Sequence, residues 1–185
     1  NHELKILYKY NKRKLVPFGE FLPFEKSLNR IGLKKITQGH GSFLKGKKQN
    51  NILIDNMNIL PLICYEIIFP ELIQKANNKT NLIINISEDG WFGDSIGPHQ
   101  HFAHSVFRAI ESGKYLLRSA NNGISATINP IGLIENKIEF GQSGYIDFFE
   151  KRVFNETVFS KYGNKMFLTI ILLYIFLIFS FNRIS

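Results

Sequence analysis

Residues 51–86 read NILIDNMNILPLICYEIIFPELIQKANNKTNLIINI, and their pattern decides the fold class. Two short apolar runs flank a turn at Asn56, and a third apolar run of the buried type covers 82–86. Between them, residues 70–76 have the character of a helix. A strand, a turn, a helix and a strand in this order predict an α/β fold in which helices cover a sheet.

Downstream of this stretch, predicted helices and strands continue to alternate. A Gly-rich loop, SEDGWFGDSIGPHQ at 87–100, ends near Pro98, and proline is favoured at the first position of a helix. Apolar residues at helical spacing follow as far as Gly113 and predict a helix that packs on one face. Short strands separated by turns come next, LLRSA at 116–120, LIENKIEF at 133–140 and SGYIDFF at 143–149. We place this first domain at 1–160.

The N-terminal part is basic and irregular. LKILYKYN at 4–11 has the pattern of a strand, and the prolines and glycine of LVPFGEFLPF at 15–24 mark a structured loop. Residues 1–50 hold 12 Lys and Arg but only three acidic residues, and the whole chain has a net charge of +8. Such an excess can face nucleic acid, anionic lipid or solvent, of which solvent is the commonest. We predict no nucleic-acid partner.

The length and composition exclude several classes of protein. A chain of 185 residues with 44% hydrophobic residues can form one packed domain and is neither disordered nor fibrous. The single cysteine cannot form an internal disulfide, so bridges do not stabilise the fold.

The C-terminal part contains the most apolar segment. MFLTIILLYIFLIFSF, from 166 to 181, has no charged residue and is bounded by Lys165 and Arg183. Sixteen helical residues span about 24 Å, somewhat less than the roughly 30 Å hydrocarbon core, but long cationic side chains can extend to the headgroups. We predict a transmembrane helix with short flanks at 161–185, in preference to a buried core helix.

Cys64, Lys12 and Glu20 are the first candidates for chemistry. Cys64 closes an apolar run and precedes a turn, where a thiolate can be favoured by a helix N-terminus, a cation or a base. The alternative is a small buried hydrophobic residue. Lys12 precedes a rigid turn, and Glu20 is a plausible partner that holds a lysine in place. Alternatively, Lys12 is a charged side chain in solvent, and Glu20 is a loop carboxylate in water.

Three histidines do not complete a metal site. His101 and His104 share a helical face, but His99 precedes the helix and no second cysteine or neighbouring acid completes a ligand set. We predict neither a metal nor a cofactor.

Four ordered strings together resemble a known family. They are YNKRKLVPFGEFLP, ICYEIIFPE, ISEDGWFGDSIGPHQH and LLRSANNGISATINPIG. In this order they resemble the carbon–nitrogen hydrolase (nitrilase) superfamily. VPFGEFLP, WFGDSIGPHQHF and RSANNGIS narrow the resemblance to the apolipoprotein N-acyltransferases of bacterial envelopes. The likeness runs from about residue 4 to about 150 and continues in the C-terminal helix.

The resemblance implies the fold and the site. The fold would be part of a nitrilase-type αββα sandwich followed by one transmembrane helix. The family uses a metal-free Glu, Lys and Cys triad, in which the matching motifs make Cys64 the nucleophile and Lys12 the triad lysine. The residues that the resemblance assigns to supporting roles are Glu20, Tyr65, Glu66 and Trp91.

Two departures from the family pattern affect the expected chemistry. The family's triad glutamate lies upstream of the string that contains Lys12, so this chain is expected to be a C-terminal fragment that lacks the general base. A separately encoded N-terminal part could supply it. Glu88 stands where relatives usually carry Asn, which places an extra negative charge near the thiol.

The resemblance also implies a reaction and a location. A fatty acyl group would pass from a phospholipid, through a thioester on Cys64, to the N-terminal amine of a diacylglyceryl-cysteine lipoprotein. The protein would lie in the bacterial inner membrane, with the catalytic domain on the periplasmic side and the C-terminus in the cytoplasm. The alternatives are a membrane-anchored amidase of the same superfamily and an inactive membrane-bound remnant.

Overall fold

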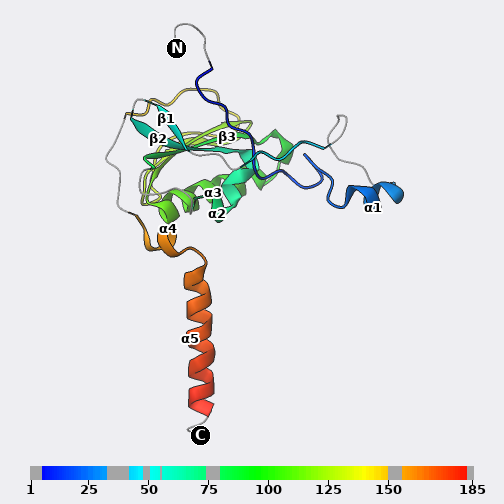
Figure 1. The fold of residues 1–185 in the computed structure, drawn as a ribbon. Helices are drawn as coiled ribbons and strands as arrows, with labels where there is room; N and C mark the ends of the chain where they lie inside the picture. The colour runs from blue at the N-terminus through cyan, green and yellow to red at the C-terminus, as the bar shows by residue number, and fades with distance from the viewer. Residues whose placement is uncertain are drawn as a thin grey trace.

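A six-stranded sheet forms the centre of the molecule (Figure 1). The computed structural model describes residues 6–32, 42–47, 51–54, 56–73, 80–149 and 156–182. The sheet order follows the sequence, β1 (Ile52–Ile54), β2 (Met57–Ile63), β3 (Leu82–Glu88), β4 (Tyr115–Asn121), β5 (Ser125–Ile128) and β6 (Ile134–Ile138). The predicted mixed α/β fold is confirmed.

The arrangement of the strands fixes where a site can form. The central strands β2, β3 and β4 are parallel, whereas β1, β5 and β6 pair antiparallel at the two sides. Parallel strands are covered on their faces and therefore carry continuous apolar runs. The turn predicted at Asn56, which has a φ of 66°, joins β1 to β2. The carboxyl ends of β2, β3 and β4 lie at one edge of the sheet.

The long helix α3 (Gly97–Ser112) covers one face of the sheet, together with the shorter η1 (Cys64–Ile68) and α2 (Pro70–Ile73). As predicted, α3 has Pro98 in its first turn and ends at Gly113, whose φ of 66° is left-handed. Its buried face includes Phe102 and Ala109 but also four polar residues, His101, Ser105, Arg108 and Ser112. The apolar periodicity did not predict those polar positions.

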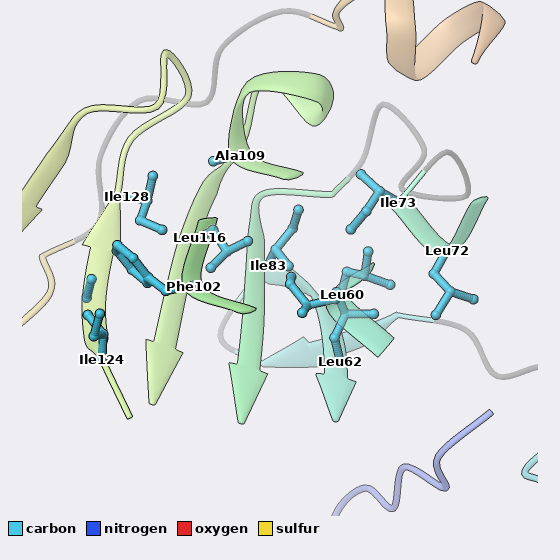
Figure 2. Close-up of a cluster of buried hydrophobic side chains, with 12 residues drawn as sticks. Leu60, Leu62, Leu72, Ile73, Ile83, Phe102, Ala109, Leu116, Ile124 and Ile128 are labelled. Atoms are coloured by element: carbon cyan, nitrogen blue, oxygen red, sulfur yellow. The ribbon is translucent and has the colours of Figure 1, made fainter. Parts of the chain in front are cut away.

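The main core lies between the sheet and α3 (Figure 2). The buried side chains from the sheet and the helices are Leu60, Leu62, Ile67, Leu72, Ile73, Ile83, Phe102, Ala109, Leu116, Ile124, Ala126 and Ile128. Their burial provides the main favourable contribution to folding, and it holds the carboxyl ends of the central strands in a fixed arrangement.

Ile83 provides a test of this core. Ile83 on β3 has no exposed surface, and replacing it with alanine is expected to lower the free energy of unfolding by about 2–5 kcal/mol. Ile86 on the same strand is 61% exposed, so Ile86→Ala should change it by less than about 0.5 kcal/mol. Urea denaturation of both variants measures the difference, and equal effects would contradict this assignment of the core.

The opposite face of the sheet carries a second, smaller cluster. Ile59, Leu82 and Tyr115 are buried there, and the ring of Phe148 lies 5.5 Å from that of Tyr115. The strand predicted at 143–149 is wrong, because this segment packs a side chain over the sheet and pairs with no edge strand. Residues 6–11 are also not a strand, since no ladder forms along them, and residues 4 and 5 lie outside the described residues.

The C-terminal prediction needs correction. Gly163 ends α4 (Val158–Tyr162), and the apolar run 166–181 forms the helix α5 (Lys165–Asn182). Among the described residues, none of the helices combines the length and apolar character required to cross a membrane. The transmembrane helix predicted at 161–185 is therefore not supported.

Two helices extend away from the sheet (Figure 1). None of the residues of the short α1 (Glu25–Arg30) is buried. The apolar α5 projects from the body of the domain, and large side chains such as Phe167 and Phe179 are about two-thirds exposed, at 67% and 68%.

Candidate active site

Cys64 occupies a strained turn at the carboxyl edge of the parallel strands. It follows β2 directly and has a φ of 51°, a left-handed value that costs a non-glycine residue about 1–2 kcal/mol. Its partly exposed thiol donates to the backbone oxygen of Glu88, at the end of β3, over 3.7 Å. Strain of this kind persists only where surrounding contacts enforce it, and it is common at active sites.

Glu66 ties the N-terminal loop to this turn. Its buried carboxylate accepts hydrogen bonds at Oε1 from the backbone N–H groups of Arg13, at 2.6 Å, and Lys14, at 3.1 Å. Oε2 accepts from the Tyr10 hydroxyl at 2.9 Å and from the backbone N–H of Ile63 at 2.8 Å. These contacts bring the loop that contains Lys12 against the turn that carries the thiol.

Tyr10 remains a hydrogen-bond donor in this arrangement. Burial and the negative charge of Glu66 raise the pKa of Tyr10 well above its usual range. The phenol therefore stays protonated at neutral pH and donates to Glu66, while the Arg13 Nε donates to the phenol oxygen over 3.2 Å.

Lys12 is held by an ion pair with Glu20. The Lys12 Nζ lies 2.7 Å from Glu20 Oε1, and the other carboxylate oxygen accepts from the backbone N–H of Val16 at 2.9 Å. The backbone N–H of Gly46 donates to the Lys12 carbonyl at 2.7 Å. A Cβ at Gly46 would collide with the backbone oxygens of Asn11 and Lys12, so only glycine permits this close approach. The ammonium group thus has a defined position.

The comparisons with known proteins decide the family. Residues 1–147 match the family model described as carbon-nitrogen hydrolase.

The chain belongs to the carbon–nitrogen hydrolase family.

Several relatives within this family are named apolipoprotein N-acyltransferase. The one from Rhodopseudomonas palustris is 45% identical over 148 residues, which cover 80% of this chain and 28% of the relative. The one from Rickettsia bellii is 43% identical over 181 residues, covering 95% of this chain and 34% of the relative. The chain spans about a third of the length of the curated relatives that it matches.

A solved structure supports the nitrilase-type fold. A mutant of the Nesterenkonia AN1 amidase from the nitrilase superfamily matches 74% of this chain and 48% of its own, with a TM-score of 0.50. The two sequences are 19% identical, so this likeness concerns the fold alone.

Tyr65 and Trp91, the other two residues expected to support the site of this carbon–nitrogen hydrolase, differ in their surroundings. Tyr65 follows the thiol directly, and its ring packs edge-on against that of Phe69, with 5.2 Å between the centroids. Trp91 lies on η2 (Gly90–Phe92) and is 67% exposed. Tyr65 therefore belongs to the turn that carries Cys64, whereas the indole ring of Trp91 is largely open to solvent.

The carboxylate of Glu88 turns toward a neighbouring loop. It accepts hydrogen bonds from the Asn121 side chain at 2.6 Å and from the backbone N–H of Gly90 at 2.7 Å. The Asn121 bond and then the Gly90 bond lower the pKa of Glu88 below its usual value. The negative charge predicted near the thiol is thus engaged by these donors, and a carboxyl with a lowered pKa is a weak base.

A buried polar cluster beneath the site was missed by the sequence analysis. Asp89 accepts from Arg118 at 2.7 Å and from Ser87 at 2.7 Å, and His101 Nδ1 lies 2.9 Å from it. Burial works to raise the pKa of Asp89, but the His101 hydrogen bond and the charge of Arg118 outweigh it, so this pKa is lowered. The only signal in the sequence was the presence of Arg118 in the strand LLRSA and of Asp89 in the loop SEDGWFG.

All three histidines lie on α3, so the expectation that His99 precedes the helix is wrong. His101 is engaged with Asp89, and burial followed by the charge of Arg108 lowers the pKa of His104. In the described parts of the chain, no three His, Cys, Asp or Glu side chains are grouped in a way that could hold a metal ion.

A pocket of about 460 Å³ opens beside the Lys12 loop. Its lining combines apolar and charged side chains, and it consists of Arg13, Lys14, Leu15, Phe21, Leu22, Glu25, Ser42, Phe43, Leu44 and Lys45. Pockets of this size and character accept apolar groups of small ligands.

Glu66 gives a test of the connection between loop and turn. In Glu66→Ala, four buried or half-buried donors lose their acceptor, and the free energy of unfolding is expected to fall by about 3 kcal/mol. Glu71→Ala is the control, because Glu71 makes a partly exposed ion pair with Lys14 and its loss should cost less than about 1 kcal/mol. Urea denaturation measures both, and a Glu66 effect no larger than that of Glu71 would contradict the anchoring role.

Proposed function

We propose that this chain is the nucleophile-bearing part of an apolipoprotein N-acyltransferase. It would transfer a fatty acyl group from a phospholipid to the N-terminal amine of a diacylglyceryl-cysteine lipoprotein. The observation that carries the proposal is the strained turn of Cys64, tied through Glu66 to the loop that holds Lys12. The name of the relatives, at 38–45% identity, supports the choice of reaction.

The first step forms a thioester. The Cys64 thiolate attacks the ester carbonyl carbon of the phospholipid, and a carbon–sulfur bond forms. The carbon–oxygen ester bond then breaks, and the lysophospholipid leaves as an alcohol after taking a proton. The Lys12 ammonium would stabilise the negative charge on the carbonyl oxygen, a contribution typically worth about 3 kcal/mol.

The second step transfers the acyl group to the amine. The lipoprotein amine attacks the thioester carbon, a carbon–nitrogen bond forms, the carbon–sulfur bond breaks and the amine loses a proton to a base. A thiol suits this step because a thioester reacts readily with amines, whereas an oxyester intermediate would transfer slowly.

The base that removes these protons would come from another segment. Four carboxylates of the described residues contact the Cys64 turn or the Lys12 loop, and each is engaged, one of them being Glu71, which pairs with Lys14. Glu66 accepts four hydrogen bonds, Glu20 holds Lys12, and Glu88 accepts from Asn121 and Gly90. On the strength of the family resemblance, we propose that a glutamate from a segment outside these 185 residues acts as the general base.

The apolar surfaces of the chain support lipid substrates. The pocket beside Lys12 is lined by Leu15, Phe21 and Leu44 among others and could accept part of an acyl chain. The exposed apolar side chains of α5 support contact with lipid. The proposal places the chain at the bacterial inner membrane, with the catalytic domain on the periplasmic side.

The test is a transfer assay with both lipid substrates. The full chain is combined with a labelled phospholipid and a diacylglyceryl-cysteine peptide, with and without the part of the Rickettsia bellii relative that precedes the matched region. The label is expected on the peptide amine only when both parts are present. Hydrolysis of small amides without any transfer would contradict the proposal and favour an amidase. Rapid transfer by the chain alone would contradict the need for an outside base.

A further inference from the structure

A row of register partners crosses the three parallel strands beneath Cys64. Leu62 on β2 pairs with Asn85 on β3, which pairs with Arg118 on β4. Asn85 and Arg118 are buried, although their neighbours along each strand are mainly apolar. A buried polar side chain is costly unless it is hydrogen-bonded, so the partners of these two residues indicate their role.

Asn85 connects Arg118 to the backbone of the nucleophile. Its Oδ1 accepts a hydrogen bond from the Arg118 guanidinium. Its Nδ2 donates to the carbonyl oxygens of Leu62, at 3.3 Å, and Cys64, at 3.4 Å. Because arginine can only donate, it fixes the amide oxygen toward β4 and the amide NH₂ toward β2. The carbonyl of the strained residue is therefore held by an oriented donor.

Arg118 is itself held on several sides. Its guanidinium donates to Asp89 at 2.7 Å and, through Nε, to the carbonyl of Ile124 at 3.2 Å. On α3, His101 Nδ1 lies 3.1 Å and Ser105 Oγ lies 3.5 Å from the same group. The opposite charges of Arg118 and Asp89 compensate each other in the interior, so the guanidinium is a rigid support for Asn85.

We propose that Asn85 is a positioning residue that fixes the Cys64 carbonyl, and through it the direction of the thiol, with Arg118 holding the Asn85 amide in place. Asn85 contacts the backbone of the nucleophile and not the acyl group. The inference rests on the proposed role of Cys64 as the nucleophile. The hydrogen bond from Asn85 explains why Cys64, which is not a glycine, keeps a φ of 51°.

Alkylation of Cys64 tests the inference independently of acyl transfer. Cys64 is the only cysteine, so the rate of reaction with iodoacetamide reports on it alone. The rate is followed with rising pH until it no longer increases, and this limiting rate depends on the position and surroundings of the sulfur rather than on its protonation. Asn85→Asp keeps the size of the side chain and the acceptor for Arg118 but removes the amide donor.

Asn85→Asp is expected to remain folded and to change the limiting alkylation rate at least fivefold. Once the base is supplied, its kcat for acyl transfer should fall at least tenfold, with the KM for phospholipid unchanged. Ser105→Ala, which removes only the 3.5 Å contact to Arg118, is the control and should leave both rates within twofold. A folded Asn85→Asp with the wild-type limiting rate would overturn the inference, even if its melting temperature fell.

A second variant keeps the test decisive if Asn85→Asp does not fold. Arg118→Lys retains a cation opposite Asp89 but lacks the planar fork that reaches both Asp89 and Asn85. It should change the limiting alkylation rate in the same direction, and a folded Arg118→Lys with the wild-type rate would overturn the inference. If the wild type shows no acyl transfer but the alkylation rates change as expected, the proposed function fails while the positioning role stands.

Discussion

Replacing Cys64 with alanine is expected to abolish acyl transfer and the acyl-enzyme intermediate. The proposed reaction passes through a thioester on this sulfur, and alanine offers no atom to carry the acyl group. Mass spectrometry of the intact chain, after incubation with phospholipid and the part that supplies the base, should show the mass of one fatty acyl group on the wild type and none on Cys64→Ala.

Cys64→Ser separates loss of the nucleophile from loss of the fold. Serine preserves the size of the side chain and should leave the urea midpoint close to that of the wild type. Any acyl group that the serine accepts would be an oxyester, which would accumulate because it reacts slowly with the amine. Acyl transfer by Cys64→Ala at a rate near that of the wild type would contradict the assignment of the nucleophile.

Replacing Lys12 with alanine is expected to lower kcat by a factor of about 10²–10³, with little change in the KM for phospholipid. The ammonium would act on the charge that develops on the carbonyl oxygen, so its loss affects the transition state more than the bound substrate. Single-turnover acylation of Cys64, followed by mass spectrometry, measures this effect without the second step.

Lys14→Ala is the matched control for Lys12. Lys14 belongs to the same loop, but its ammonium pairs with Glu71 at 2.7 Å and lies 4.6 Å from the centroid of the Phe69 ring. Its loss should change kcat by less than about threefold, because an exposed ion pair contributes little. Equal losses in the two variants would mean that the loop needs positive charge in general and would contradict a specific role for Lys12.

The sequence predicted the parts of the fold that depend on local pattern. The continuous apolar runs became the central strands, and Asn56 forms the turn between β1 and β2. Pro98 and Gly113 mark the beginning and end of α3. Each of these features follows from preferences of a few adjacent residues. The position of Cys64 at the end of a strand was predicted in the same way, since a strand ends where its apolar run ends.

The polar contacts beneath the site could not be predicted from pattern. Asn85 lies within the run LIINI and Arg118 within LLRSA, where each looks like an isolated polar residue in a strand. Their pairing depends on the register between β3 and β4, and that register is set by the whole core. The four hydrogen bonds of Glu66 likewise involve residues as far as 56 positions away.

The incorrect predictions also have physical reasons. Segments 6–11 and 143–149 have the composition of strands, but a strand forms only where another strand accepts its hydrogen bonds. The apolar C-terminal segment does form a helix, as its composition predicted, but the finding that no described helix could cross a membrane leaves the predicted span unsupported. For segments 6–11 and 143–149, the outcome depends on a neighbour in space rather than on composition.

The central claim is that the Cys64 thiol and the Lys12 amine share one site, and chemical cross-linking tests it most directly. Succinimidyl iodoacetate joins a thiol to an amine through a single acetyl group, and Cys64 is the only thiol that can react. Peptide mapping after reaction of the folded chain is predicted to find Cys64 joined mainly to Lys12, and this product should disappear in urea. Cross-links from Cys64 to other lysines, with Lys12 carrying none, would contradict the account.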